Sequence, residues 1–389
     1  MLPPFQKHRR TVLKNLSLLA TSVSFPFIPI THGFAQSNRN VNGSGAAVWD
    51  IVQIVDTSTL QQDVSKDFLI GARAAWQSIN QKGGLQGQPV RHVVLEVDGT
   101  QASARKAFIA AQSSGSCLVI SGTTGDTTSQ FITQWLQDEA SQLAHVAPWL
   151  QNSERVVGHK TFAICADRQT QISHAAAYWA GFGVKEFGVI YASTLEQSAH
   201  RQEIERIGKE LRIKIIHMPV QDDLQIQGQT LVTGAPSVQI FIGGTPELIA
   251  LVQGLEAQKR TSVIMGLSDI NLQTIQQLGI AKTTTIIVAQ SVPVVTSPLP
   301  IVQAYRAAMA RFFDEPPTPL SLAGFLAARY TYEVLSRVSR PLSRLAAFNA
   351  FAQREPIDLG GYKINYRGTS RGSQYVTLSM LGQAGKTIG

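Results

Sequence analysis

The loop SGTTG, at residues 121–125, carries side-chain types that bind the polar end of a small molecule. It follows the apolar run CLVI and precedes a predicted helix. Glycine lets a ligand approach the backbone, hydroxyl groups donate and accept hydrogen bonds, and a helix start favours an anion such as a carboxylate. An ordinary helix-capping loop contains the same residues, and Asp126 would compete with an anion for the positive end of the helix. Both interpretations stay open for this loop.

Three further loops place polar groups after predicted strands. Residues 56–60 follow the first strand, residues 147–149 follow the fourth, and residues 267–269 follow a strand in the second half. Ligands of open parallel sheets bind beyond the carboxyl ends of the strands, so these loops are candidate ligand contacts. Trp149 either stacks on a ligand or packs at a domain boundary. Each loop taken alone is more typical of a structural turn.

The sequence lacks the patterns that indicate catalysis. The glycine pairs at 83–84 and 243–244 lack the remaining positions of a phosphate-binding loop. The Gly-Ser-Gly at 43–45 falls in a flexible leader rather than on a strand-to-helix turn, which argues against a hydrolase nucleophile. The eight histidines are scattered, without HExxH or a paired metal spacing. We therefore expect no enzyme, no metal site and no cofactor.

Alternating strand and helix patterns set the fold class. WDIVQIV predicts a first strand, and apolar side chains at 68, 72, 75, 76 and 79 then follow with the spacing of one helix face. The alternation continues through HVVLEV, CLVIS, TFAICA, FGVIYA, VQIFIGG and TIIVAQSV to an antiparallel-looking tail. A parallel pair needs a crossover long enough for a helix. The pattern therefore predicts an α/β protein with two doubly wound parallel-sheet lobes joined by a hinge.

The first 35 residues have the pattern of an export signal. A basic start with Arg9 and Arg10 precedes an apolar stretch from Leu16 to Ile30, and cleavage is expected after Ala35. The paired arginines followed by Thr-Val-Leu-Lys are typical of twin-arginine export, with an ordinary secretory signal as the alternative. Residues 36–47 predict a flexible leader. The expected location is the periplasm.

Charge and cysteine content fit a protein that is free in solution there. Four of the eight net positive charges lie in the export signal, and the rest are spread without a basic run, so no nucleic-acid partner is expected. Cys117 and Cys165 lie in apolar runs far from the cleavage site. They offer no lipid anchor, and buried free thiols are favoured over a disulfide. No later stretch is apolar enough to span a membrane.

Several patches together resemble the branched-chain amino-acid (Leu/Ile/Val) type of ABC-transporter periplasmic solute-binding protein, the type I periplasmic fold. The first patch is FLIGARAAWQSINQKGGLQGQPVRHVVLEV at 68–97, and CLVISGTTG follows it. The later patches are residues 290–293, LPIVQAYRAAM, SLAGFLAA at 321–328, and Leu-Gly-Gly at 359–361 with RGSQYV. The resemblance covers roughly residues 48–385. It implies two lobes that close on a ligand by a hinge motion, and an inner-membrane ABC transporter permease as partner.

The resemblance also assigns ligand-binding roles. The SGTTG loop matches the one that holds an amino-acid carboxylate, the 147–149 loop matches a ligand-lining loop, and Asp269 matches a position that meets an ammonium group. The sequence departs from the family at Trp149, where a small residue is usual, and in the loops at 56–60 and 192–197. A planar ligand on Trp149 and a pocket narrowed by it are both open. The predicted ligand-binding residues are Ser58, Thr59, Ser121, Gly122, Thr123, Thr124, Ala147, Pro148, Trp149, Thr194, Glu196, Leu267, Ser268 and Asp269.

The lobe boundaries and the function complete the prediction. Lobe 1 is expected at 48–162 and 291–343, and lobe 2 at 163–290 and 344–389. The expected function is capture of a small polar molecule, an amino acid or related compound, by a monomeric solute-binding protein of an ABC importer. The alternative is a ligand-sensing periplasmic receptor component of the same fold. An exported α/β enzyme is a third class, for which the sequence shows no nucleophile or base.

Overall fold

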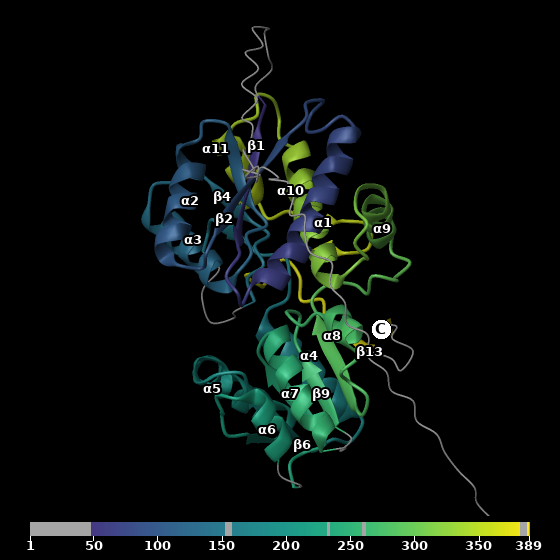
Figure 1. The fold of residues 1–389 in the computed structure, drawn as a ribbon. Helices are drawn as coiled ribbons and strands as arrows, with labels where there is room; N and C mark the ends of the chain where they lie inside the picture. The colour runs from purple at the N-terminus through teal and green to yellow at the C-terminus, as the bar shows by residue number, and fades with distance from the viewer. Residues whose placement is uncertain (1–47, 152–157, 232–233, 259–261, 382–386, 389) are drawn as a thin grey trace, which may run out of the picture. The chain divides into compact units, whose positions relative to one another are not determined.

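The computed structural model describes residues 48–151, 158–231, 234–258, 262–381 and 387–388. The predicted export signal at 1–35 and the leader at 36–47 lie outside the described residues. Within the unit Ala46–Gly389, the chain forms two α/β lobes, each built on a largely parallel sheet (Figure 1). This confirms the fold class that the alternating pattern predicts.

The first sheet has five parallel strands in the order β2-β1-β3-β4-β5. The strands are β1 (Asp50–Asp56), β2 (Arg91–Val97), β3 (Cys117–Ser121), β4 (Ala144–Val146) and β5 (Thr161–Phe162). The connecting helices are α1 (Gln62–Gln81), α2 (Gln101–Ser113) and α3 (Asp126–Asp138). The strand order reverses between β1 and β3. Loops diverge at such a point, and ligands of open sheets bind there.

The second sheet has the order β14-β13-β10-β9-β8-β6-β7. Its parallel strands are β6 (Glu186–Tyr191), β7 (Lys214–His217), β8 (Val238–Ile242), β9 (Ser262–Gly266) and β10 (Thr284–Gln290). The antiparallel tail adds β13 (Thr377–Leu381) and β14 (Thr387–Ile388). The helices are α4 (Arg168–Gly181), α5 (Thr194–Leu211), α6 (Leu224–Thr230), α7 (Thr245–Ala257) and α8 (Leu272–Leu278). The order again reverses, between β6 and β8.

Each sheet is buried on both faces, which explains why its strands are nearly continuous apolar runs. In β8, Val238, Ile240 and Ile242 pack against α4 and α5, whereas Phe241 packs in the cluster that contains α6, α7 and α8. Successive side chains of a strand point to opposite faces, so one strand supplies both layers. The first sheet has two corresponding clusters, with α2 and α3 on one face and α1 on the other.

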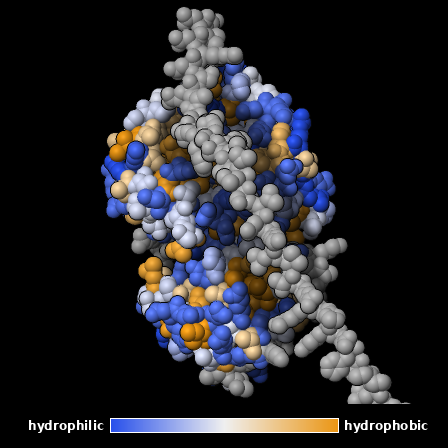
Figure 2. Space-filling model, viewed as in Figure 1, coloured by the Kyte–Doolittle hydropathy of each residue, from blue (hydrophilic) through white to orange (hydrophobic). Residues whose placement is uncertain are grey.

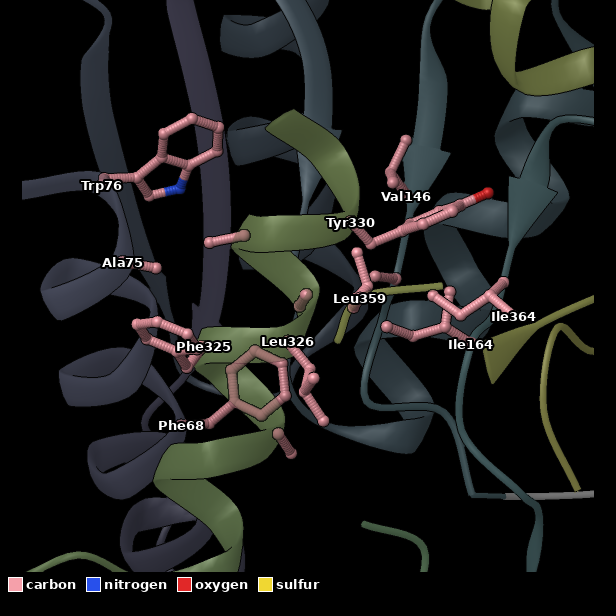
Figure 3. Close-up of a cluster of buried hydrophobic side chains, with 14 of the residues drawn as sticks. Phe68, Ala75, Trp76, Val146, Ile164, Phe325, Leu326, Tyr330, Leu359 and Ile364 are labelled. Carbon is pink, nitrogen blue, oxygen red and sulfur yellow. The ribbon is translucent and has the colours of Figure 1, made fainter. Parts of the chain in front are cut away.

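Helix α1 packs on α10 (Pro319–Ser336) at unusually close range. An added Cβ at Gly71 would lie 1.6 Å from the carbonyl oxygen of Ser321, and one at Gly324 would lie 1.9 Å from that of Phe68. Only a residue without a side chain lets the two backbones approach so closely. Around this contact, Phe68 and Trp76 of α1 gather with Phe325, Leu326 and Tyr330 of α10 in one apolar cluster (Figure 3).

Part of the chain beyond the expected lobe boundary at residue 344 packs in the hydrophobic cluster of the first lobe. Helix α9 (Pro300–Phe312), helix α11 (Arg344–Ala352) and the hairpin of β11 (Ile357–Asp358) and β12 (Lys363–Ile364) all contribute to the first-lobe cluster. Phe351 contacts Phe162 and Tyr330, and Tyr362 is fully buried. Of the tail residues that the structure describes, only β13 and β14 join the second sheet. We therefore propose that lobe 1 extends to about residue 366.

The visible surface is mixed in hydropathy (Figure 2), and the two cysteines are buried. Hydrophilic and hydrophobic side chains are interspersed over the visible face (Figure 2). None of the described helices combines the length and the apolar character needed to cross a bilayer. Cys117 and Cys165 are free and buried, and burial raises the pKa of Cys117 to about 12 and that of Cys165 to about 11. Neither thiol is therefore activated for chemistry at neutral pH.

Candidate functional site

A cleft with a cavity of about 200 Å³ lies where loops of both sheets meet. The first lobe lines it with Thr59, Leu60 and the start of α1, and the second lobe lines it with loops after β6, β8 and β9. All of these loops follow the carboxyl ends of parallel strands, the position that the fold favours for a ligand. Second-lobe residues of the cleft include Ser193, Leu195, Glu196, Thr245 and Asp269.

Glu196 stands at the start of α5 because Ser193 caps that helix. The Ser193 hydroxyl accepts a hydrogen bond from the Glu196 amide at 3.2 Å, as a capping serine does. Glu196 Oε2 then lies 3.2 Å from His200 Nε2. Burial raises the pKa of Glu196, but its hydrogen bond with His200 and the charge of Arg168 outweigh burial and leave that pKa below its usual value. Glu196 is thus an ionised carboxylate at the cleft.

Asp269 does not face the cleft with a free carboxylate. Its Oδ1 accepts a hydrogen bond from Trp149 Nε1 at 2.8 Å, and its Oδ2 lies 2.9 Å from Arg168 Nη2. Arg168 also lies 3.1 Å from Asp126 Oδ2. Burial opposes the charge of Arg168, but Asp126 and Asp269 raise the pKa of its guanidinium above the usual value. The arginine therefore stays protonated between two carboxylates.

The SGTTG loop is engaged inside the first lobe. Thr123 Oγ1 lies 3.0 Å from His145 Nε2, and Ser121 Oγ lies 2.7 Å from Thr331 Oγ1. Thr124 Oγ1 accepts a hydrogen bond from the Asp56 amide and lies 2.6 Å from Ser65 Oγ. Gly122 has φ +71°, in the left-handed region that glycine tolerates. In this conformation the loop joins α3 to the sheet, and its three hydroxyls are taken by protein groups.

The cleft brings together three of the predicted residues and leaves the others outside its lining. Thr59, Glu196 and Asp269 line the cleft. Ala147, Pro148, Leu267 and Ser268 are buried, and Ser268 Oγ donates to Gln171 Oε1 at 2.8 Å. Ser58 is half-buried and Thr194 is exposed at the start of α5. Which of these residues touch a ligand stays a prediction.

Sequence reasoning missed Arg168 and the glycines at 243–244. Arg168 begins α4 just beyond the TFAICA segment, and Gly243 and Gly244 follow β8. The rule that ligands bind beyond strand ends would have selected these positions. The glycine pair was tested only against phosphate-loop motifs. Among the described residues, no group of three or more acidic, histidine or cysteine side chains is arranged to hold a metal ion.

Two histidines in strands of the first sheet, His92 of β2 and His145 of β4, predict a loss of stability in acid. Burial lowers the pKa of His145 to about 3, and burial with the charge of Arg73 lowers that of His92 to about 4. An exposed histidine has a pKa near 6.5, as in the unfolded chain. Each unit by which folding lowers that pKa corresponds to about 1.4 kcal/mol in the free energy of unfolding. Below pH 6.5 both histidines are protonated in the unfolded chain, whereas they stay neutral in the folded chain. The stability that depends on these neutral histidines is therefore fully present above pH 6.5 and is lost as the pH falls toward 4.

Urea unfolding between pH 7.5 and 5 measures this effect, before most carboxylates titrate. The free energy of unfolding should change little down to pH 6.5 and then fall by about 1.4 kcal/mol per pH unit for each of these two histidines. His92→Gln should reduce the slope below pH 6.5 by about 1.4 kcal/mol per pH unit. A slope that does not change in this variant would contradict the assignment.

Comparison with known proteins identifies a family for this chain. The model of the family described as periplasmic binding protein matches residues 49–385. A search of the curated proteins found no match.

Solved structures with the same fold include proteins of different described ligands. A substrate-binding periplasmic protein from Ralstonia solanacearum has a TM-score of 0.77 at 20% identity, covering 87% of this chain and 99% of its own. A branched chain amino acid ABC transporter protein from Thermus thermophilus, with bound valine, has a TM-score of 0.74 at 11% identity, covering 88% and 95%. A fatty acid ABC transporter substrate-binding protein from Thermomonospora curvata has a TM-score of 0.76 at 13% identity, covering 89% and 92%.

Proposed function

Because the chain belongs to the periplasmic binding protein family, we propose that it is the solute-binding protein of an ABC importer and captures a small polar molecule between its lobes. The family is one of solute-binding proteins and implies a location outside the cytoplasm. The partner we propose is the inner-membrane permease of the importer. Similar solved structures that carry ABC-transporter descriptions support this role.

The observation that carries the proposal is the cleft of about 200 Å³ lined by loops of both lobes. A ligand held between Thr59 of the first lobe and Glu196 of the second contacts both only when the lobes are close together. Such a ligand favours the closed form, whereas one that touches a single lobe leaves the balance between open and closed forms unchanged. The permease then distinguishes loaded from empty protein by the closed form.

The lining of the cleft favours a ligand with both polar and apolar parts. The Thr59 and Ser193 hydroxyls and the Glu196 carboxylate supply polar contacts. Leu60 is 69% exposed and Leu195 is 77% exposed, one on each lobe at the same cleft. Binding is favoured when an apolar portion of a ligand covers these exposed leucines, because apolar surface is then removed from water. An amino acid or a related compound with an apolar portion has this chemistry.

Thermal unfolding with added compounds tests the proposal. Amino acids, amides, dicarboxylates and aromatic acids are added singly to the purified protein. A ligand at about 100 times its dissociation constant adds about 2.7 kcal/mol to the free energy of unfolding, which raises the midpoint by several degrees. We expect one chemical class to raise the midpoint.

A bulky side chain in the cleft gives the matched control. Thr59→Trp should abolish the shift by filling the cleft, whereas Thr283→Trp, at an exposed threonine outside the cleft lining, should keep it. No shift from any class, with native mass spectrometry showing no ligand retained from purification, would contradict capture of these solutes.

A further inference from the structure

Arg168 connects one carboxylate from each lobe. Asp126 begins α3 in the first lobe, and Asp269 follows β9 in the second. The two terminal nitrogens of the guanidinium lie 3.1 Å from Asp126 Oδ2 and 2.9 Å from Asp269 Oδ2. The three side chains are only 13–18% exposed. The Arg168 cation thus lies between the lobes at the wall of the cleft.

Other groups hold both carboxylates in place for this cation. The backbone N–H of Gln151 donates to Asp126 Oδ1 at 2.5 Å, and Trp149 Nε1 donates to Asp269 Oδ1 at 2.8 Å. Each carboxylate therefore offers its second oxygen to Arg168. A planar guanidinium with several fixed donors suits two carboxylates better than a lysine ammonium does. The arrangement is a built cation position that a side chain of the protein occupies.

Resting on the function proposed above, we propose that Arg168 is an internal counter-ion that takes the place of a ligand's cationic group between the lobes. Two consequences follow. The ionic bridge holds the lobes together without a ligand, so a ligand enters only when the bridge opens. Asp269 is also withdrawn from ligand binding, which leaves an ammonium group in the cleft with the carboxylates of Asp63, Glu196 and Glu247.

Chemical rescue tests the proposal through the distance between the lobes. Spin labels are placed on Ile109→Cys of α2 and Ile226→Cys of α6, both exposed positions, and the buried native thiols stay unlabelled. Without ligand, the parent protein should show one short distance by pulsed electron paramagnetic resonance. Arg168→Ala should replace it by a longer, broader distribution. Millimolar methylguanidinium, far below denaturing concentrations, should restore the short distance.

Two further variants serve as controls that separate loss of the bridge from loss of folding. Arg105→Ala removes an ion pair with Glu139 that lies within the first lobe, and it should leave the distance unchanged. Asp126→Asn removes the first-lobe half of the bridge and should lengthen the distance without response to methylguanidinium. Circular dichroism confirms that each variant is folded.

The outcomes separate this inference from the proposed function. An unchanged distance in both Arg168→Ala and Asp126→Asn overturns the bridge, even where a solute still raises the unfolding midpoint of the parent protein. A lengthened distance that methylguanidinium fails to restore overturns the cation position. A restored distance supports the inference, and the proposed function then depends only on the solute panel.

Discussion

Gly71→Ala is expected to destabilise the protein by more than about 3 kcal/mol, although alanine is the better helix former by about 1 kcal/mol. The added Cβ would lie 1.6 Å from the Ser321 carbonyl oxygen, far inside contact distance. Overpacking a core costs about 1–3 kcal/mol when side chains can adjust. Here the obstacle is backbone, so α1 and α10 have to move apart. The Phe68 and Phe325 packing between them is lost with that movement.

The same substitution at Gly181 is the matched control. Gly181 lies in α4 with open space around the position of an added Cβ. Gly181→Ala should therefore raise the free energy of unfolding by up to about 1 kcal/mol through helix propensity alone. Urea unfolding of the two variants measures both effects. Equal changes at the two glycines would show that α1 and α10 tolerate a wider separation and that the close approach does not stabilise the lobe.

The sequence predicted the first helix of this contact but not the contact itself. Gly71 and Gly324 both fall in patches that resemble the family, and the apolar spacing around Phe68 correctly predicts a helix. Local spacing reports which face of a helix is buried. It does not report which of several helices covers that face, because partners about 250 residues apart are chosen by the whole packing. The proposed extension of lobe 1 to about residue 366 rests on the same kind of long-range packing, which local spacing does not report.

The predicted ligand-binding residues overlap only in part with the residues that line the cleft. The rule for parallel sheets selects loops of the kind that line the cleft, and Thr59, Glu196 and Asp269 are among the lining residues. The SGTTG loop shows the limit of residue types as evidence. A hydroxyl that suits a ligand equally suits His145 or Ser65, and only the fold decides which partner is near. Arg168 was missed because a single arginine after an apolar segment carries no motif.

Arg371→Met is expected to lower the free energy of unfolding by about 3–5 kcal/mol, the usual result of removing one partner of a buried ion pair. Arg371 is 5% exposed where the chain passes from the first lobe to β13. Its Nη1 donates to the carbonyl oxygens of Leu150 at 2.7 Å and Cys165 at 3.1 Å, and its Nε lies 3.4 Å from Asp167 Oδ2. One side chain therefore links three segments between the sheets.

Methionine matches the length of arginine and keeps its apolar stem, so the loss is mainly electrostatic. It leaves two carbonyl oxygens and the Asp167 carboxylate without this donor in a buried place. Burial lowers the pKa of Arg371, with Asp167 acting against that effect. Urea unfolding of Arg371→Met and of Arg367→Met measures the difference. Arg367 is exposed in the same segment, and its loss should change stability by no more than about 0.5 kcal/mol.

A double variant decides whether the charge pair or the carbonyl bonds dominate. Asp167→Asn removes the unpaired charge that Arg371→Met leaves behind. The double variant should therefore be more stable than the sum of the two single losses indicates, by about 0.5–3 kcal/mol for coupled neighbours. Strict additivity would show that the carbonyl hydrogen bonds carry the effect. A change of less than about 1 kcal/mol in Arg371→Met itself would mean that the segments between the lobes stay together without this arginine, since a typical single hydrogen bond contributes about that much.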